Sequence, residues 1–374
     1  MSPLDLTLDV QQCRDRQARL QSVMERMEVD RVLLLAPENV QWLTGFRPHR
    51  LMAAATTLDL DGTVCLSVPN AEPEGVAADH VAVYEAQWRA TLRQEQALAA
   101  AEALNGLVGK RPAARKLAAE FSLCGPLAEL GPDCGVSTGC VDIEPQLWKL
   151  RRFKHDDELR MIMRAIECTE SMYGAAREMI GPGVTELDVF NRLHAAAVDV
   201  AGEPLTALGN DFQCNSPGGP PRCRAAQSGE LFILDLSPVY RGYYADNCRT
   251  IAVAGPPTDC QMDAWRRIVS VLEMVEATVV PGMSCAEVFR RAQEELDDYR
   301  PDAFFHHLGH GFGLFPHEAP HLNSAWNDTF EQGDVFTAEP GLYGPELRAG
   351  IRLEQNYRVT ADGVERLTSF PLDL

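Results

Sequence analysis

Four acidic residues in the second half of this chain have the types and positions of metal ligands. Asp235 and Asp246 each interrupt an apolar, strand-like segment, and Glu339 and Glu354 do the same further along. A carboxylate inside an apolar strand is costly to bury unless an arginine, a hydrogen-bond network or a metal ion compensates it. One arginine could neutralise one such acid. If the four converge, they need more positive charge than the nearby arginines supply, and two divalent cations would provide it.

The imidazole for such a site is expected in a histidine-rich segment. Five of the nine histidines lie between residues 304 and 321. His310 stands among Gly309, Gly311 and Gly313, which argue against a regular helix and would let the backbone approach a ligand closely. Several carboxylates with one imidazole suit Mn²⁺, Co²⁺, Fe²⁺ or Zn²⁺.

A second metal motif in this segment is rejected. Residues 317–321 match the His-Glu-x-x-His pattern, which needs both histidines on one face of a helix. Pro320 would break that helix, and Pro316 directly precedes the pattern. A zinc-protease helix is therefore not expected.

Composition limits the classes of partner. The 374 residues carry a formal net charge of −20, which disfavours nucleic acids and anionic membrane surfaces as partners. The N-terminus lacks a signal-peptide pattern, and no apolar run is long enough to span a bilayer. The 11 cysteines form no CxxC pair, as is typical of free thiols in a reducing compartment. We expect a cytoplasmic protein.

Two domains must position these residues. Residues 1–152 alternate short strands and helices, and no phosphate-binding loop or histidine cluster occurs among them. A long amphipathic helix near 156–181 opens the second domain, residues 153–374. We therefore predict an α/β N-terminal domain followed by an α+β domain.

The second domain contains a weak internal repeat. Residues 182–192 resemble residues 281–291, and each copy has a predicted helix cap, Thr185 with Asp188 and Ser284 with Glu287. Strand-like sequence with two of the four acids follows each copy. Duplicated halves would place the acids on facing sheets around a pseudo-two-fold axis.

These motifs resemble the creatinase, prolidase, aminopeptidase P and methionine aminopeptidase superfamily, the "pita-bread" metallopeptidases. The match involves the strand with Asp235, Tyr-Ala-Asp-Asn-Cys-Arg-Thr around Asp246, Gly-His-Gly-Phe-Gly around His310, Glu-Pro-Gly-Leu-Tyr at Glu339 and Ile-Arg-Leu-Glu at Glu354. Residues 39–46 also resemble the N-terminal domain of the prolidase and aminopeptidase P branch. The resemblance implies a C-terminal pita-bread domain with antiparallel sheets around the metal site, and a creatinase-type N-terminal domain.

The resemblance also implies roles for individual residues. Asp235, Asp246 and Glu354 are expected to bind or bridge two metal ions, and His310 to complete one of them. Glu339 is expected to bind metal and to accept the proton of a bridging water.

Further roles near the reacting bond follow from the same resemblance. His317 is expected to stabilise the oxyanion and His306 to contact the substrate. Arg352 is expected near the site, either in a salt bridge or on the substrate. For His307 and His321 the favoured interpretation is a histidine that is only hydrogen-bonded within the loop.

One position departs from the prolidase and aminopeptidase P pattern. Those relatives usually have a histidine where this chain has Gly218, although Pro221 is retained. The missing imidazole would have helped to bind substrate. Arg222 or Arg224 could replace it by holding a substrate carboxylate, a task that suits a planar guanidinium.

The sequence thus predicts a dinuclear metal-dependent exopeptidase that hydrolyses Xaa-Pro bonds through a metal-bridging hydroxide, prolidase-like or aminopeptidase P-like. Mn²⁺ is the expected metal, with Co²⁺ or Zn²⁺ as alternatives. The expected partners are a small peptide substrate and a second copy of the chain in a homodimer. Three alternatives remain: a metallohydrolase of a non-proline amide, a metal-free creatinase-type hydrolase, and a non-catalytic binding protein on this fold.

Overall fold

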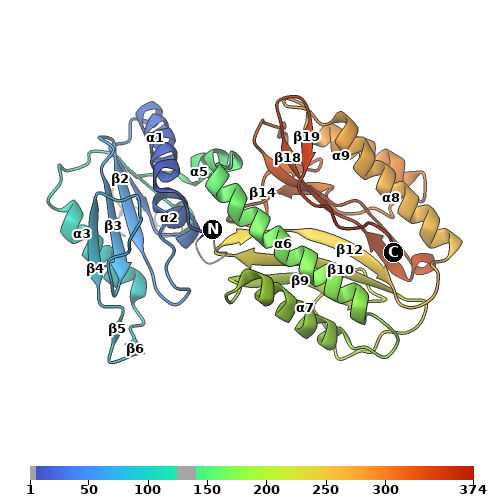
Figure 1. Ribbon diagram of the computed structural model, residues 1–374. Coiled ribbons are helices and arrows are strands. Elements are labelled where there is room, and N and C mark those ends of the chain that lie inside the picture. Colours follow the sequence, from blue (N-terminus) through green and yellow to red (C-terminus); the bar gives the residue numbers. More distant parts are fainter. Residues whose placement is uncertain (1–5, 124–139) are drawn as a thin grey trace, which may run out of the picture. The chain divides into compact units, whose positions relative to one another are not determined.

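The computed structural model describes residues 6–123 and 140–374 (Figure 1). The chain divides into two compact units, Thr7–Arg151 and a second unit that contains Arg152–Leu374. Among the described residues, no helix is both long and apolar enough to cross a membrane.

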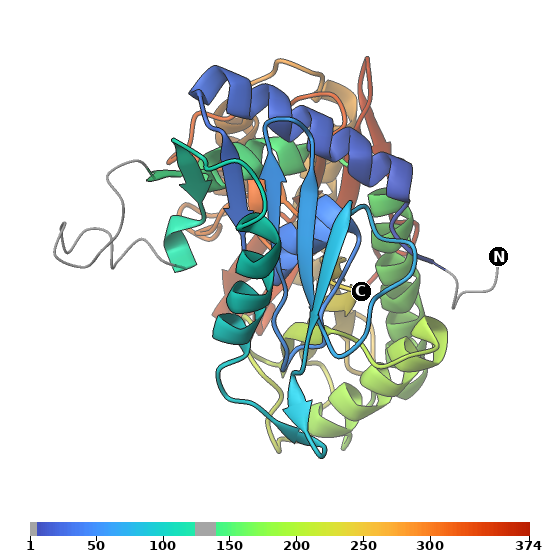
Figure 2. The same cartoon turned by 90° about the vertical axis from the view of Figure 1, so that its left-hand side faces the viewer.

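The N-terminal unit is built on one mixed six-stranded sheet. Its strands run in the order β4-β3-β2-β1-β7-β8. The strands are β1 (Arg31–Leu34), β2 (Ala55–Asp59), β3 (Val64–Pro69), β4 (His80–Tyr84), β7 (Leu117–Ala119) and β8 (Cys140–Asp142), with β5 (Gln87–Trp88) and β6 (Thr91–Leu92) as a separate pair. The helices are α1 (Val10–Met27), α2 (Pro37–Thr44), α3 (Gln96–Val108) and α5 (Glu144–Arg152). Figure 2 shows the blue strands side by side, with the teal helix α3 packed against them.

Local sequence explains the central hairpin of this sheet. A turn at Asp61-Gly62 joins β2 to β3, which pair antiparallel. Gly62 adopts a positive φ of 89°, which a glycine accommodates without strain. The Asp61 side chain accepts a hydrogen bond from the Thr63 backbone N–H at 3.0 Å and so closes the turn.

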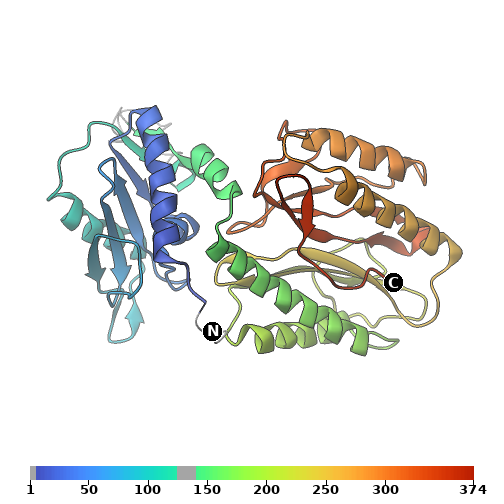
Figure 3. The same ribbon diagram turned by 45° about the horizontal axis from the view of Figure 1, so that its top comes forward.

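The C-terminal unit consists of two halves, each with a pair of helices and an antiparallel sheet. The first half contains α6 (Asp156–Met179), α7 (Glu186–Ala201), β9 (Ala207–Cys214), β10 (Leu231–Tyr240), β11 (Tyr243–Tyr244) and β12 (Asn247–Ala252). The second contains α8 (Asp259–Thr278), α9 (Cys285–Asp297), β13 (Gly309–Gly311), β14 (Glu318–Leu322), β15 (Val335–Ala338), β16 (Gly341–Gly344), η3 (Pro345–Leu347), β17 (Ala349–Arg352), β18 (Gln355–Val359) and β19 (Val364–Arg366). In Figure 3, α6 lies beside α7 and α8 beside α9.

The sheets of the two halves have related arrangements. In the first, β10 pairs with β9, β11 and β12, and helix α6 packs on it. In the second, the order is β14-β13-β15-β18-β19, and β16 pairs with β17. Helix and antiparallel sheet are thus duplicated, and the predicted α+β class is confirmed.

The two predicted helix caps differ in outcome. Thr185 and Asp188 form the full reciprocal cap at the start of α7. At α9, the Ser284 side chain accepts the Glu287 backbone N–H, but the Glu287 carboxylate pairs with Arg290 at 2.6 Å. An ion pair one turn along the helix has therefore replaced half of the second cap.

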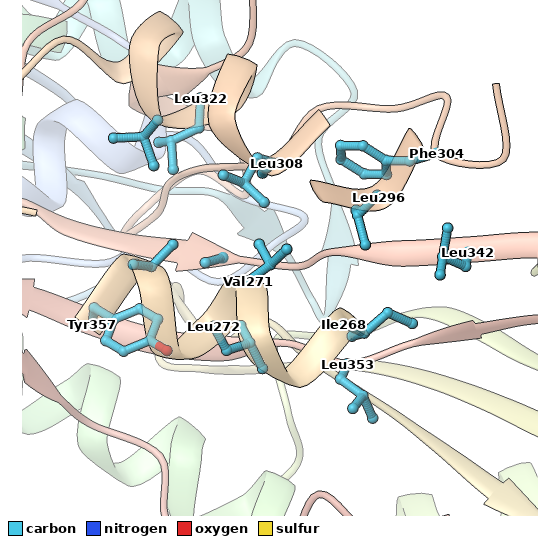
Figure 4. Close-up of a cluster of buried hydrophobic side chains, with 14 of the residues drawn as sticks. Ile268, Val271, Leu272, Leu296, Phe304, Leu308, Leu322, Leu342, Leu353 and Tyr357 are labelled. Atoms are coloured by element: carbon cyan, nitrogen blue, oxygen red, sulfur yellow. The ribbon is translucent and has the colours of Figure 1, made fainter. Parts of the chain in front are cut away.

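A large apolar core lies under the second half and fixes its strands. Figure 4 shows Ile268, Val271 and Leu272 of α8 in one cluster with Leu342 of β16 and with Leu353, which follows β17. All five are at most 2% exposed. Burying each such side chain is worth about 1.5–3 kcal/mol, so this core holds rigidly the strand ends that carry Glu339 and Glu354.

Candidate metal centre and active site

The first two candidate ligands are brought together by a hairpin. Asp235 lies inside β10, and Asp246 directly precedes β12, which pairs antiparallel with β10. The turn at Arg241-Gly242 lies between them. The Ser237 hydroxyl donates a hydrogen bond to Asp246 Oδ1 at 2.5 Å, which fixes that carboxylate.

The other three candidates come from the second half. Glu339 follows β15, and Glu354 stands between β17 and β18. The Glu354 N–H donates to the Cys248 carbonyl oxygen at 3.0 Å, which joins the sheets of the two halves beside the site. His310 is the middle residue of β13, and its Nδ1 lies 3.0 Å from the Gly311 carbonyl oxygen.

These five side chains meet in the interior. His310 Nε2 lies 3.4 Å from Glu339 Oε1 and 3.7 Å from Asp246 Oδ2. Ligand atoms of Asp235, Asp246 and Glu354 lie within 4.8 Å of one another. The exposed fractions of the five residues range from 1% for Glu354 to 9% for Asp235. We call Asp235, Asp246, His310, Glu339 and Glu354 the metal centre.

Unpaired oxygens support cation binding by this group. Asp235 Oδ1 and both carboxylate oxygens of Glu354 are buried and have no hydrogen-bond partner among the described residues. Leaving such acceptors unsatisfied costs about 1–3 kcal/mol each, and more when they are charged. Four carboxylates and one imidazole are also a suitable donor set for borderline divalent cations. The residues present therefore fit the metal ions that the sequence predicts.

Without cations, the electrostatics of the metal centre are unfavourable. Burial, followed by the charges of neighbouring carboxylates, raises the pKa of Glu354 well above its ordinary value. Burial likewise raises the pKa of Asp235, although the Arg352 charge opposes this shift. Both carboxyl groups thus hold a proton more tightly than an exposed carboxyl group does, and a bound cation would compete with that proton.

His310 and Glu339 respond in the opposite sense. Burial disfavours the imidazolium, but the hydrogen bond and charge of Glu339 overcome it and raise the pKa of His310 to about 9. Burial also opposes ionisation of Glu339, yet the same contact with His310 holds the pKa of Glu339 well below its usual range. In the metal-free protein, a proton on His310 therefore provides part of the missing positive charge.

Glycines flank His310 because strands are crowded there. A Cβ at Gly309 would lie 2.0 Å from the Thr337 carbonyl oxygen, and one at Gly311 would lie 2.1 Å from the Ala319 carbonyl oxygen. The close approach is thus to neighbouring backbone, whereas the glycine pattern in the sequence predicts an approach to a ligand.

The rejected His-Glu-x-x-His motif is not helical. Glu318–Leu322 forms strand β14, with a cis peptide bond before Pro320. Glu318 pairs with buried Lys154 at 2.7 Å. The motif therefore has a structural ion pair where a zinc protease would have its catalytic glutamate.

A cavity of about 450 Å³ opens onto the metal centre. Its described lining residues are Asp211, Pro217, Gly218, Asp235, Asp246, Phe305, His306, His307, His310, His317, Glu339, Tyr343 and Arg352. The metal centre thus lies in a space large enough for a small peptide.

One wall of the cavity is a directed chain of hydrogen bonds. Arg352 Nη2 donates to Asp235 at 2.7 Å, and Arg352 Nη1 donates to the Tyr343 hydroxyl at 3.1 Å. Tyr343 lies 2.9 Å from His306 Nε2, and His306 Nδ1 lies 2.8 Å from the His307 carbonyl oxygen. Since that carbonyl can only accept, Nδ1 carries the proton and Nε2 accepts from the tyrosine.

The remaining histidines of the segment lie in different surroundings. His317 is exposed, and its ring stacks on His310 with centroids 3.9 Å apart. Partial shielding from water by neighbouring groups, followed by the charge of His310, lowers the pKa of His317 to about 4, so the ring is neutral at pH 7. His307 lines the cavity, and its buried Nδ1 lies 3.4 Å from Glu339 Oε1 without a hydrogen-bond partner among the described residues. His321 instead pairs with Asp328 at 2.8 Å and stacks on Trp326.

The structure does not bring Arg222 or Arg224 to the cavity. Arg222 pairs with buried Glu186 at 2.6 Å, and Arg224 pairs with buried Glu230 at 2.5 Å. This differs from the sequence-based expectation of a substrate contact, because each guanidinium is already held by a buried glutamate.

Two polar residues of the cavity, Asp211 and Tyr343, have no role predicted from the sequence. Asp211 interrupts strand β9 as an isolated acid, the same signal that identifies Asp235, and could have been found that way. Tyr343 follows Glu339 closely, but its contact with His306 depends on the fold and has no signal in the sequence.

Comparisons with known proteins agree with this geometry. Residues 160–361 match the model of metallopeptidase family M24, and residues 16–152 match the creatinase/prolidase N-terminal domain. An Xaa-Pro dipeptidase from Pyrococcus furiosus is 30% identical over 236 residues, which are 62% of this chain and 67% of that protein. An Xaa-Pro dipeptidase from Pyrococcus horikoshii is 26% identical over 94% of this chain and 96% of its own length.

Solved structures share the fold. An Xaa-Pro dipeptidase from Bacillus anthracis has a TM-score of 0.81 at 22% identity, covering 97% of this chain and 99% of that one. The prolidase from Pyrococcus furiosus has a TM-score of 0.76 at 24% identity and covers 94% and 99%. Together, the two matched domains and the assembled metal centre show that this chain belongs to metallopeptidase family M24.

Proposed function

We propose that this protein is a metal-dependent exopeptidase that hydrolyses Xaa-Pro bonds. The observation that carries the proposal is the buried metal centre at a peptide-sized cavity within the M24 domain. The names of the relatives from Pyrococcus, both Xaa-Pro dipeptidases, support the choice of substrate.

Two divalent ions are the proposed cofactors. Asp235, Asp246 and Glu354 would hold both, and His310 and Glu339 would complete the set. When bound, such ions lower the pKa of water and polarise the scissile carbonyl.

The chain's own residues would move the proton and stabilise charge. Glu339 is ionised and buried, so it is placed to accept a proton from the attacking water. His317 is neutral and still has an N–H to donate to the developing oxyanion. His306 is the proposed substrate contact, but both of its ring nitrogens are engaged in the wall, so it would act through Tyr343 or after rearrangement.

Arg352 is the proposed link between the metal centre and this wall. Its contact with Asp235 orients a carboxylate of the metal centre, and its contact with Tyr343 orients His306. A positioning role is therefore favoured over a direct contact with substrate.

The alternatives from the sequence analysis are less well supported. A metal-free hydrolase would not need Glu354, whose buried oxygens have no partner. A non-catalytic protein would not need an ionised Glu339 beside a neutral, exposed histidine. Hydrolysis of a non-proline amide remains the alternative that a substrate assay must separate.

The test is hydrolysis by protein stripped with a chelator and refilled with Mn²⁺, Co²⁺ or Zn²⁺. Ala-Pro, Ala-Pro-Ala and the matched control Ala-Ala would be the substrates. We expect turnover of at least one proline peptide and little of Ala-Ala. Cleavage of Ala-Ala alone would favour the non-proline amide, and no turnover with two metals bound would reject the peptidase. The use of Mn²⁺, a homodimer and a cytoplasmic location stay predictions.

A further inference from the structure

The cavity contains an acidic residue beyond the metal centre. Among the described residues that line the cavity, Asp211 is the one carboxylate outside the metal centre, and Arg352 is the one arginine or lysine. The charges of Asp211 and Arg352 determine whether this side of the cavity can accept a charged group of the substrate.

Asp211 is held firmly against Arg352. Arg352 Nη2 donates to Asp211 Oδ2 at 2.5 Å and to Asp235 Oδ2 at 2.7 Å. The backbone N–H of Gly219 donates to Asp211 Oδ1 at 2.6 Å. One guanidinium nitrogen is therefore shared by two carboxylates, Asp211 and Asp235.

Gly218 makes room for this arrangement. A Cβ at position 218 would lie 2.3 Å from Asp211 Oδ2 and 2.7 Å from its Cγ. Any side chain at 218 would displace the carboxylate from Arg352. The Asp211 carboxylate thus occupies the space that a side chain at position 218 would otherwise fill.

The consequence concerns the group next to the scissile bond. In a dipeptide Xaa-Pro, the free carboxylate is attached to the carbon that neighbours the scissile nitrogen. When that bond lies at the metal centre, the carboxylate must lie inside the cavity. It would meet Asp211 there, and the single arginine is already paired. Placing like charges together costs binding energy, whereas a neutral amide carries no such cost.

We propose that Asp211 is a specificity-determining residue that disfavours substrates with a free carboxylate next to the scissile bond. The preferred substrates are then Xaa-Pro peptides that continue beyond proline, in which an amide replaces that carboxylate. This inference rests on the proposed function and narrows it towards an aminopeptidase.

The matched pair Ala-Pro and Ala-Pro-NH₂ tests this directly, because the two differ only in that group. For the metal-loaded wild type we expect kcat/KM to favour the amide on the order of tenfold or more. Asp211→Asn preserves the shape and the contact with Gly219 but frees Arg352, so the preference should shrink towards unity. Asp373→Asn removes an exposed aspartate from its ion pair with Arg177 and should leave the preference unchanged.

A wild type that cleaves Ala-Pro as well as its amide would overturn the inference, whether or not the variant folds. An unchanged preference in a folded Asp211→Asn protein would also overturn it. If Ala-Pro, its amide and Ala-Pro-Ala all resist cleavage, the proposed function fails by itself. In that case the affinities of L-proline and L-prolinamide for the metal-loaded protein, measured by calorimetry, test the role of Asp211. Tighter binding of prolinamide supports that role, and any other result rejects it.

Discussion

Replacing Glu354 by glutamine should stabilise the metal-free protein and destabilise the metal-loaded one. Glu354 is 1% exposed, and neither of its oxygens has a partner among the described residues. A buried charge costs several kcal/mol, while an unpaired neutral amide costs about 1–3 kcal/mol. Partial protonation of Glu354 reduces the difference, so we expect a gain of about 1–2 kcal/mol without metal. For a domain of this size, that raises Tm by roughly 2–8 °C.

With metal, the order should reverse. Ions at a hundred times Kd stabilise the wild type by about 2.7 kcal/mol, and glutamine weakens their binding. Thermal unfolding at pH 8 in chelator and in Mn²⁺ would measure both effects. Glu318→Gln is the matched control, because this buried glutamate is paired with Lys154 at 2.7 Å. Losing this ion pair should lower the free energy of unfolding by about 3–5 kcal/mol, both in chelator and in Mn²⁺. A Glu354→Gln protein that is less stable than the wild type in chelator would refute the reasoning.

Three further predictions address the cavity, the strands and the protons. If the His317 N–H stabilises the oxyanion, His317→Ala should lower kcat by about 10²–10³-fold with little change in KM. A rise in KM with unchanged kcat would instead indicate that His317 binds the substrate. Gly311→Ala should destabilise the protein by about 3 kcal/mol or more, since its Cβ would lie 2.1 Å from the Ala319 carbonyl oxygen; urea unfolding would measure this, and a neutral effect would contradict the geometry. The metal-free protein should lose stability as pH rises from 6 to 9, because His310, with a pKa near 9, and Glu354, with a raised pKa, both bind protons more tightly when folded. Chemical denaturation across this pH range would test the sign, and saturating metal should abolish or reverse the trend.

Local sequence was enough to place the four acids in or beside strands, although Asp246, Glu339 and Glu354 lie next to strand ends and not inside strands as expected. Asp235 and Asp246 lie on either side of a short turn, so an antiparallel pair brings them together. The repeat with its capped helices indicated a second half that carries Glu339 and Glu354. Prolines excluded a helix at residues 317–321, and that segment is a strand.

Long-range contacts could not be predicted in this way. Arg352 and Asp211 are separated by 141 positions in the sequence, and their ion pair depends on how β9 and β17 lie in the folded domain. Arg222 and Arg224 looked available because their buried glutamate partners are not recognisable in the sequence. The crowding at Gly311 likewise comes from a neighbouring strand. In each case a competing contact, made only by the fold, determines what the residue can do.

The central claim is that the metal centre binds two divalent ions. Equilibrium dialysis of chelator-stripped protein against Mn²⁺, with elemental analysis of the bound metal, measures this most directly. We predict two ions per chain in the wild type and a loss of both in Asp246→Asn, whose carboxylate lies between the Asp235 and His310 sides of the site. A wild type that binds no ion, or an Asp246→Asn protein that still binds two with unchanged affinity, would contradict the account.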